Sequence, residues 1–484
     1  MDKKLLKETD NYSKSLIEEI EKQYLKAVKL LNRKIVVLDD DPTGIQTVHG
    51  VYVFTGWTQA MMEDGFSNPE NIFYILTNSR SFSKQKTKKV HEIIAKEVIV
   101  ASEKSGKNYI IISRSDSTLR GHYPLETETL RRTIESASGK KYDGEILIPF
   151  FSEGGRITVN NTHYLLEKDR LIPVSESEFA KDKSFGYKHA HLGEFVEEKT
   201  AGEYKAEECE YISINDLRSL KVDEITHQLM KVKDYGKIIV NAENYYDMKV
   251  FVIALVKAIL DGKEYLFRSA ASFPKTLSGI ADKPYLKAEE LVSPKANNGG
   301  IILIGSHVRK TTEQMKCLLN SGLALTEVEF NQHLVMDDEK MEVEVNRVRQ
   351  IVDYSISQGR HVVVYTKRER YDLDTEDQEE QLRVSVKISD ALTEIIKRLE
   401  AQPGFMITKG GITSSDIGTK AIGVQKAYVM GQAIPGVPVW MTGAESKFPH
   451  MPLIIFPGNV GDENALKDIV ERLAGQIENS TQGK

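Results

Sequence analysis

The chain has 484 residues, of which 40% are hydrophobic and 28% are charged, and this balance excludes a disordered or low-complexity protein. A formal net charge of −6 gives no general attraction to nucleic acid or to an anionic membrane, so any phosphate binding must come from a local site. A single hydrophobic core seldom grows to this length, and we therefore expect two large domains that act on small molecules.

The N-terminal region and the cysteines indicate an intracellular protein. Residues 5–31 carry apolar side chains at helical spacing instead of the continuous apolar stretch of a secretion signal. No run in the sequence approaches the roughly 18 apolar residues of a membrane span. Cys209 and Cys317 lie far apart and lack neighbours at metal-ligand spacing, which argues against a disulfide framework or a zinc site. We expect a cytoplasmic location.

Short β-branched runs alternate with longer helical patterns in the first half of the chain. This alternation is typical of an α/β fold, in which a mostly parallel sheet is flanked by helices. Ligands of such sheets bind at the carboxyl ends of the strands. The predicted strands are residues 34–38, 51–54, 72–76, 109–113, 146–148 and 238–241, and helical patterns include 84–105 and 124–137.

A segment rich in turn-forming residues divides the chain. Residues 288–300 include Pro294, Asn297 and two glycines, and a new apolar strand follows at 301–304. We predict an N-terminal domain over residues 1–290 and a C-terminal domain over residues 299–484, the latter also α/β. Its further elements are strands at 361–365, 405–407 and 453–456, helices at 311–320 and 384–401, and a final helix beyond residue 462.

Three consecutive carboxylates follow the first predicted strand. Asp39, Asp40 and Asp41 stand before a Pro-Thr-Gly turn. Because adjacent carboxylates repel one another, a site that retains them uses their charge, either for a metal ion or for a base. A solvated Asp-Pro turn is the alternative interpretation. Their place at the carboxyl end of a strand favours a binding site.

A second polar cluster follows the strand at 109–113. It contains Arg114, Asp116, Ser117, Thr118 and Arg120. Arginines can grip a carboxylate with two hydrogen bonds, and an aspartate accepts from hydroxyls, so the set suits a polyhydroxylated anion. Helix capping would explain the serines and the aspartate, but it does not explain both arginines.

Two further predicted strands also end in polar residues. Ser79 and Arg80 follow the strand at 72–76, and a loop that ends at Arg156 follows the strand at 146–148. Each loop alone could be an ordinary surface connection. Four strand ends that deliver such groups to one sheet edge instead predict a pocket for an acid sugar.

Three glycine-bearing turns follow predicted strands in the C-terminal half, at residues 305–307, 409–416 and 457–462. Glycine allows close backbone approach, and amide groups at turns and helix starts bind phosphate oxygens. Each turn alone is common in α/β domains. Neither a Walker P-loop nor a Rossmann fingerprint occurs in the sequence.

Other features have less specific interpretations. Residues 435–440 and 443–446 could shape an adenine pocket, and a proline-rich connection between strands explains them equally well. His122 and His307 stand in polar turns, but a single histidine is more often structural, and neither is assigned to catalysis.

In their order and composition these motifs resemble those of the four-carbon acid sugar kinase family over nearly the whole chain. The shared segments are Asp40–Gly44, Ser79–Arg80, Asp116–Gly121 and Pro149–Arg156, followed by the three glycine turns. Pro42 and the Asn459-Val460 pair depart from the usual family pattern, which indicates a divergent branch.

The resemblance implies two α/β domains with the active site in the cleft between them, and an ATP- and Mg²⁺-dependent kinase acting on a threonate, erythronate or 3-oxo-tetronate type of acid. Asp40, Asp41 and Asp116 would be catalytic. The predicted substrate-binding residues are Ser79, Arg80, Arg114, Ser117, Thr118, Arg120 and Arg156. The predicted nucleotide-binding residues are Ser306, Gly410, Gly411, Ile412, Thr413, Gly458, Asn459 and Gly461.

Two other functions remain open from the sequence. The carboxylate cluster could serve a nucleotide-independent sugar-acid aldolase or dehydratase, or the protein could be a non-catalytic sensor of acid sugars. We predict a small-molecule acid and ATP as partners, with no nucleic acid and no membrane. The sequence does not fix the metal ligands or the oligomeric state, for which a homodimer is one option.

Overall fold

A computed structural model describes residues 12–167, 170–293, 298–375 and 378–482. The chain forms two compact units, one from residues up to Asp40 together with Gly56–Ala281, the other from Asp41–Thr55 together with residues from Asp282 onward. The segment Asp41–Thr55, which the sequence placed in the N-terminal domain, therefore packs with the C-terminal half. Pro294 and Asn297 of the predicted linker lie outside the described residues.

The main sheet of the first unit is parallel throughout. Its order starts at β3 and runs through β1, β4, β11, β5 and β10 to β9. Since all carboxyl ends of parallel strands lie at one edge, the polar residues after β1, β3, β4, β5 and β11 are gathered there. The strands are β3 (Ile72–Leu76), β1 (Lys34–Asp39), β4 (Tyr109–Arg114), β11 (Tyr265–Ser269), β5 (Gly144–Ile148), β10 (Gly236–Val240) and β9 (Glu210–Ile212).

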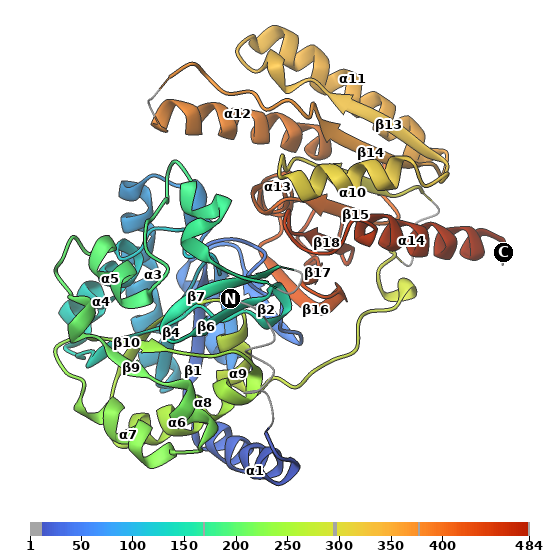
Figure 1. Ribbon diagram of the computed structural model, residues 1–484. Helices are drawn as coiled ribbons and strands as arrows, with labels where there is room; N and C mark the ends of the chain where they lie inside the picture. Colours follow the sequence, from blue (N-terminus) through green and yellow to red (C-terminus); the bar gives the residue numbers. More distant parts are fainter. Residues whose placement is uncertain (1–11, 168–169, 294–297, 376–377, 483–484) are drawn as a thin grey trace. The chain divides into compact units, whose positions relative to one another are not determined.

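Helices cover both faces of this sheet, which explains why its central strands are buried and almost continuously apolar. The helices α3 and α4 pack against each other, and α1 and α7 pack against α8 (Figure 1). The helices of this unit are α1 (Lys14–Leu30), α2 (Gln59–Ser67), α3 (Lys84–Ser105), α4 (Leu125–Ser138), α5 (Leu192–Lys199), α6 (Ile214–Arg218), α7 (Val222–Lys231), α8 (Tyr245–Leu260) and α9 (Ser272–Ser278).

Helix boundaries in the first unit follow capping signals in the sequence. Ser83 accepts a hydrogen bond from the Lys86 backbone amide at the start of α3, and Gly106 ends that helix in the left-handed conformation. A small antiparallel sheet follows β5. Its strands are β6 (Arg156–Val159), β7 (Thr162–Glu167) and β8 (Arg170–Pro173).

The sheet of the second unit is mostly parallel, in the order β13, β14, β12, β15, β18, and continues with antiparallel β17, β16 and β2. The strand at residues 51–54 was thus correctly predicted, but it pairs with β16 and is antiparallel. The strands are β13 (Leu325–Phe330), β14 (His361–Thr366), β12 (Ile301–Ile304), β15 (Met406–Lys409), β18 (Pro452–Phe456), β17 (Val437–Met441), β16 (Lys426–Ile434) and β2 (Val51–Phe54).

Two helix pairs flank this second sheet. The helices α10 and α14 pack together over a core that includes Ile302, Ile407 and Ile454, while α11 packs with α12 and against β13 and β14 (Figure 1). The helices are α10 (Arg309–Leu319), α11 (Asp338–Ser357), α12 (Gln378–Lys397), α13 (Gly411–Asp416) and α14 (Ala465–Gln482). In the described part of the chain, no helix combines the length and the apolar character needed to cross a membrane.

Candidate functional site

The end of β1 brings two aspartates to one arginine. Arg114, the last residue of β4, donates from Nη1 to Asp39 Oδ1 at 2.9 Å, and the same nitrogen lies 3.5 Å from Asp40 Oδ1. The parallel register that pairs Leu38 with Ser113 and Asp39 with Arg114 creates this contact. All three charged side chains are buried.

Asp40 has further partners. Ser115 donates to Asp40 Oδ2 at 2.5 Å, and Arg80 Nε lies 3.2 Å from the same oxygen. Burial raises the pKa of the Asp40 carboxyl, and the neighbouring Arg80 and Arg114 offset only part of this effect. Asp40 is therefore a carboxylate that can accept a proton more readily than an exposed aspartate.

Asp116 lies in the same cluster but in a different electrostatic environment. Arg120 donates from Nε to Asp116 Oδ2 at 2.7 Å, Thr118 donates to the same oxygen, and Arg80 Nη1 lies 3.8 Å from Oδ1. Burial alone would raise the pKa of Asp116, but Arg120 and Arg80 hold it well below its usual range. Arg80 thus contacts both Asp40 and Asp116.

A glycine makes the close packing of this cluster possible. Gly121 has φ near 124°, which side-chain-bearing residues rarely adopt. A Cβ at this position would lie 2.6 Å from Ser115 Oγ and 2.8 Å from Arg268 Nη2. The glycine of the Asp116–Gly121 segment is therefore required by both conformation and space.

The sequence analysis missed two charged members of the cluster. Glu126, in the first turn of α4, accepts from Ser79 Oγ at 2.5 Å and from Arg268 Nη1 at 2.7 Å. Arg268, on β11, also donates to the Arg120 carbonyl at 3.3 Å. Glu126 resembles an ordinary acid at a helix start, and the strand that carries Arg268 was not predicted, so no local motif could have identified them.

The remaining predicted acid-site residues contact the small sheet and the segment that follows it. The Ser117 carbonyl accepts from His163 Nε2 at 2.8 Å, and the Thr118 carbonyl accepts from Tyr187 at 2.6 Å. Arg156 begins β6 and donates to the Gly154 carbonyl. His122 donates to two backbone carbonyls, those of Ser79 and Phe82, which fits a structural histidine.

In the second unit the three glycine turns meet at Ser306. A Cβ on Gly410 would lie 3.0 Å from Ser306 Cβ, and one on Gly458 would lie 2.7 Å from Ser306 Oγ. Thr311 donates to the Gly458 carbonyl at 3.0 Å and lies 3.3 Å from Ser306 Oγ. A Cβ on Gly461, whose φ is 80°, would meet Ala465. These turns place backbone segments without obstructing side chains close together.

The segment after β15 also contacts the Asp-Asp motif. A Cβ on Gly411 would collide with Asp41 Oδ2, so the Asp41 carboxylate lies directly against the Gly411 backbone. Likewise, Thr413 Oγ1 fills the space beside Gly305. The structure therefore groups Asp41 with the second unit, whereas Asp40 and Asp116 share the cluster of the first. Ile412 is half exposed, and Asn459 is partly buried.

Lys409 is a buried lysine that contacts these turns and has no role in the predicted site. Its backbone oxygen accepts from Gly305 and Ser306, each at 3.2 Å, and its Nζ donates to the Pro457 carbonyl at 2.7 Å. Burial, with a smaller effect of Lys310, lowers the pKa of the Lys409 ammonium well below its usual value. This one residue connects all three turns.

Other predictions for the second unit are structural. Residues 435–440 contain the turn and most of the second strand of the β16–β17 hairpin, with Pro438 inside β17. His307 Nε2 contacts the Lys367 carbonyl at 3.1 Å, so it too has a backbone partner. Among the described residues, no group of three or more His, Cys, Asp or Glu side chains is arranged to hold a metal ion.

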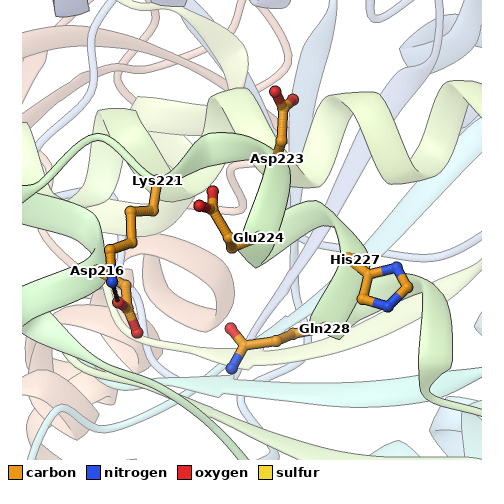
Figure 2. A pocket seen from close by; sticks show the side chains of 6 residues that line it. All are labelled: Asp216, Lys221, Asp223, Glu224, His227 and Gln228. Carbon is orange, nitrogen blue, oxygen red and sulfur yellow. Dashed lines mark hydrogen bonds and ion pairs between the residues drawn. The ribbon is translucent and has the colours of Figure 1, made fainter.

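A surface hollow of about 530 Å³ lies on α6 and α7 (Figure 2). Lys221 and Asp216, both in its lining, form an ion pair at 2.8 Å. None of the predicted site residues lines it. Its lining consists of Asp216, Lys221, Asp223, Glu224, His227 and Gln228.

Both units have counterparts among known protein families and structures. Residues 35–277 match a sugar-binding N-terminal domain, and residues 301–466 match a nucleotide-binding C-terminal domain. A Salmonella typhimurium protein described as a candidate tRNA synthase is 16% identical, with a TM-score of 0.61 over 91% of this chain and 98% of its own. A Haemophilus influenzae protein of the DUF1537 family is 18% identical, with a TM-score of 0.55 over 91% and 100%. A comparison with curated proteins gave no match.

The fold and the two matches define an α/β protein with a sugar-binding unit followed by a nucleotide-binding unit. This combination is the architecture of the DUF1537, or four-carbon acid sugar kinase, family, and the chain belongs to that family.

Proposed function

We propose that this protein is an ATP-dependent kinase that phosphorylates a hydroxyl of a four-carbon sugar acid of the threonate, erythronate or 3-oxo-tetronate type. The observation that carries the proposal is the environment of Asp40. Asp40 is a buried carboxylate with a raised pKa, it lies within a cluster of arginines, and it belongs to a chain whose other half matches a nucleotide-binding domain.

Asp40 would act as the general base. Its carboxylate takes the proton of the acceptor hydroxyl as the hydroxyl oxygen bonds to the γ-phosphorus of ATP, and the bond from that phosphorus to the bridging oxygen breaks to release ADP. Asp116 keeps its charge and would accept hydrogen bonds from the hydroxyls of the acid. The proton on Asp40 returns to solvent when the phosphate ester leaves.

The nucleotide would bind at the turns around Ser306, Gly410 and Gly458, whose backbone can approach phosphate oxygens closely. Mg²⁺ would offset the charge of the triphosphate. This ion commonly takes one or two protein carboxylates together with phosphate oxygens, and the Asp41 carboxylate against Gly411 fits that need.

The test is ATP consumption with a panel of four-carbon sugar acids. We expect turnover with at least one acid, and a loss in kcat of about 10³-fold for Asp40→Asn, the size of effect usual for a general base. Asp223→Asn, which alters a 90% exposed carboxylate, is the matched control and should leave kcat unchanged. Absence of ATP consumption across the panel, or full activity of Asp40→Asn, would refute the proposal.

A further inference from the structure

Five buried or partly buried arginines surround the acid site, and four of them contact a carboxylate of the protein. Arg114 pairs with Asp39, Arg120 with Asp116 and Arg268 with Glu126, at 2.9, 2.7 and 2.7 Å. Arg80 lies 3.2 Å from Asp40. Their charges are already balanced within the protein, so a bound acid would have to compete for them.

Arg156 is the exception. It is more than nine-tenths buried, and no carboxylate among the described residues lies within 4.0 Å of its guanidinium. Its Nη1 donates to the Gly154 carbonyl, while its Nε has no hydrogen-bond partner in the described part of the chain. A buried cation in this state is costly unless a ligand supplies the missing negative charge.

The backbone holds Arg156 firmly in this position. Its amide and carbonyl exchange hydrogen bonds with Phe151, at 2.8 and 3.0 Å, and Phe151 packs against Ala270 and Ala271 after β11. The strand β6, which Arg156 begins, lies against the Asp116–Gly121 segment: His163 of β7 pairs with Thr158 of β6 and donates from Nε2 to the Ser117 carbonyl at 2.8 Å. A guanidinium on a fixed backbone, with no carboxylate partner among the described residues, is pre-organised for an anion.

We propose that Arg156 binds the carboxylate of the sugar acid, and that the other four arginines serve to hold the carboxylates of the protein. This inference rests on the acid-binding half of the proposed function and does not depend on the kinase reaction. It makes Arg156 the residue that selects hydroxy acids over the corresponding neutral polyols.

The experiment measures binding by calorimetry in the full-length protein, with threonate and erythronate as acid probes and threitol and erythritol as neutral ones. We expect Arg156→Gln to weaken acid binding by about 100-fold or more, as for a buried charge pair that loses one partner. Binding of the polyols should not change. Arg156→Lys should recover part of the acid affinity, and Arg132→Gln, at a 68% exposed side chain, is the matched control.

Stability of the ligand-free protein gives a second readout. Removing an unpaired buried charge should leave the unfolding temperature unchanged or raise it, whereas Arg120→Gln breaks the pair with Asp116 and should lower it. Unchanged acid affinity of Arg156→Gln, or equal loss of acid and polyol binding, would overturn the proposal. So would an unfolding temperature that falls as far as in Arg120→Gln.

The outcomes also separate this inference from the kinase proposal. Acid binding that depends on Arg156 in a protein that consumes no ATP would support the role of Arg156 and refute the kinase. ATP consumption by Arg156→Gln with an unchanged KM for the acid would refute the role of Arg156 and leave the kinase standing.

Discussion

Asp40 and Asp116 are both buried and both contact Arg80, yet their pKa values shift in opposite directions. For Asp40, desolvation outweighs the attraction of Arg80 and Arg114, which lie 3.2 and 3.5 Å from its oxygens. For Asp116, the contacts with Arg120, Arg80 and Thr118 together outweigh desolvation, and the nearest of these is Arg120 at 2.7 Å. The pair therefore separates into a group that can exchange a proton and a group that stays ionised, a division typical of acid–base sites.

This division predicts the pH dependence of turnover. We expect kcat to fall as the pH drops through the raised pKa of Asp40, because the protonated carboxyl cannot accept a second proton. The pH–rate profile with saturating ATP and acid measures this limb, and Asp40→Asn should abolish it. Asp116→Asn should move the limb to lower pH, because Arg80 would then stabilise the Asp40 carboxylate alone. A limb that persists in Asp40→Asn would exclude Asp40 as the base.

His163 predicts a pH dependence of stability. It is buried, donates from Nε2 to the Ser117 carbonyl and contacts Thr158 Oγ1 at 2.9 Å, and burial lowers its pKa to about 4. In the unfolded chain the imidazole takes up a proton near pH 6.5, whereas in the folded protein it does so only near pH 4. The neutral imidazole therefore contributes its full share of the free energy of unfolding above pH 6.5. We expect the free energy of unfolding to fall by about 3 kcal/mol as the pH drops from 6.5 to 4.

Urea unfolding at several pH values tests the His163 prediction. The free energy of unfolding of the wild type should fall more steeply between pH 6.5 and 4 than that of His163→Gln, which has no imidazole to protonate. His189→Gln, at a 45% exposed side chain, serves as the control and should follow the wild type. Parallel curves for wild type and His163→Gln would contradict the buried neutral imidazole.

At the scale of the elements, the first residue of α13 is limited by space. Gly411 does not have a positive φ, so the Asp41 carboxylate is what excludes a side chain there. We expect Gly411→Ala to lower stability or ATP affinity by about 1–3 kcal/mol, the usual cost of overpacking. Gly475→Ala in α14, where a Cβ meets nothing within 4 Å, should leave ATP affinity unchanged and slightly stabilise the helix. ATP titration and thermal unfolding of both variants measure these effects.

The elements that the sequence predicted are those with a strong local pattern. The apolar runs that became β1, β3, β4, β5 and β10 were recognised, and so were the polar residues after four of the strands. Whether these residues bind an acid or a nucleotide stays a prediction. The strand β11 (Tyr265–Ser269) was missed because its apolar run is only three residues long before the polar Arg268 and Ser269, although the strand is inserted between β4 and β5. The position of a strand within a sheet depends on pairing between distant segments, and this pairing leaves no periodic pattern in the local sequence.

The helix α11 and the strands β13, β16 and β17 were also missed. In β13 and β16, exposed residues alternate with buried ones, and β17 contains a proline, so these strands differ from the continuous apolar runs of the parallel strands. Burial of Glu126, Arg268 and Lys409 could not be predicted either, because charged residues are normally exposed. The burial of these charged residues can be recognised only from the folded structure, in which distant strands lie side by side.

At the scale of the whole molecule, the N-terminal half of the chain contributes to both units. The chain passes from one unit to the other between Asp40 and Asp41, between Thr55 and Gly56, and between Ala281 and Asp282. The first passage falls within the Asp-Asp motif. Asp40 thus belongs to the cluster around Arg80 and Arg114, and the next residue belongs to the nucleotide-binding unit. A single local motif therefore provides one carboxylate to each unit.

The strand β2 provides the test of this arrangement. Val53 is almost fully buried and pairs with Ala427 of β16, and Thr55 donates from its amide to the Gln425 carbonyl at 3.0 Å. We expect Val53→Ala to accelerate hydrogen exchange in β16 and β17 while β1 and β4 keep their rates, because a buried cavity costs about 1–3 kcal/mol in the unit that contains it.

Hydrogen exchange followed by mass spectrometry of the full-length protein can resolve these strands. Val100→Ala on α3, where the side chain is 39% exposed, is the matched control and should leave both units unchanged. Equal acceleration of β1 and β4 in Val53→Ala would show that Asp41–Thr55 stabilises the first unit instead. Acceleration confined to β16 and β17 would mean that the nucleotide-binding unit requires a strand encoded about 250 residues before most of its sheet, as the strand order implies.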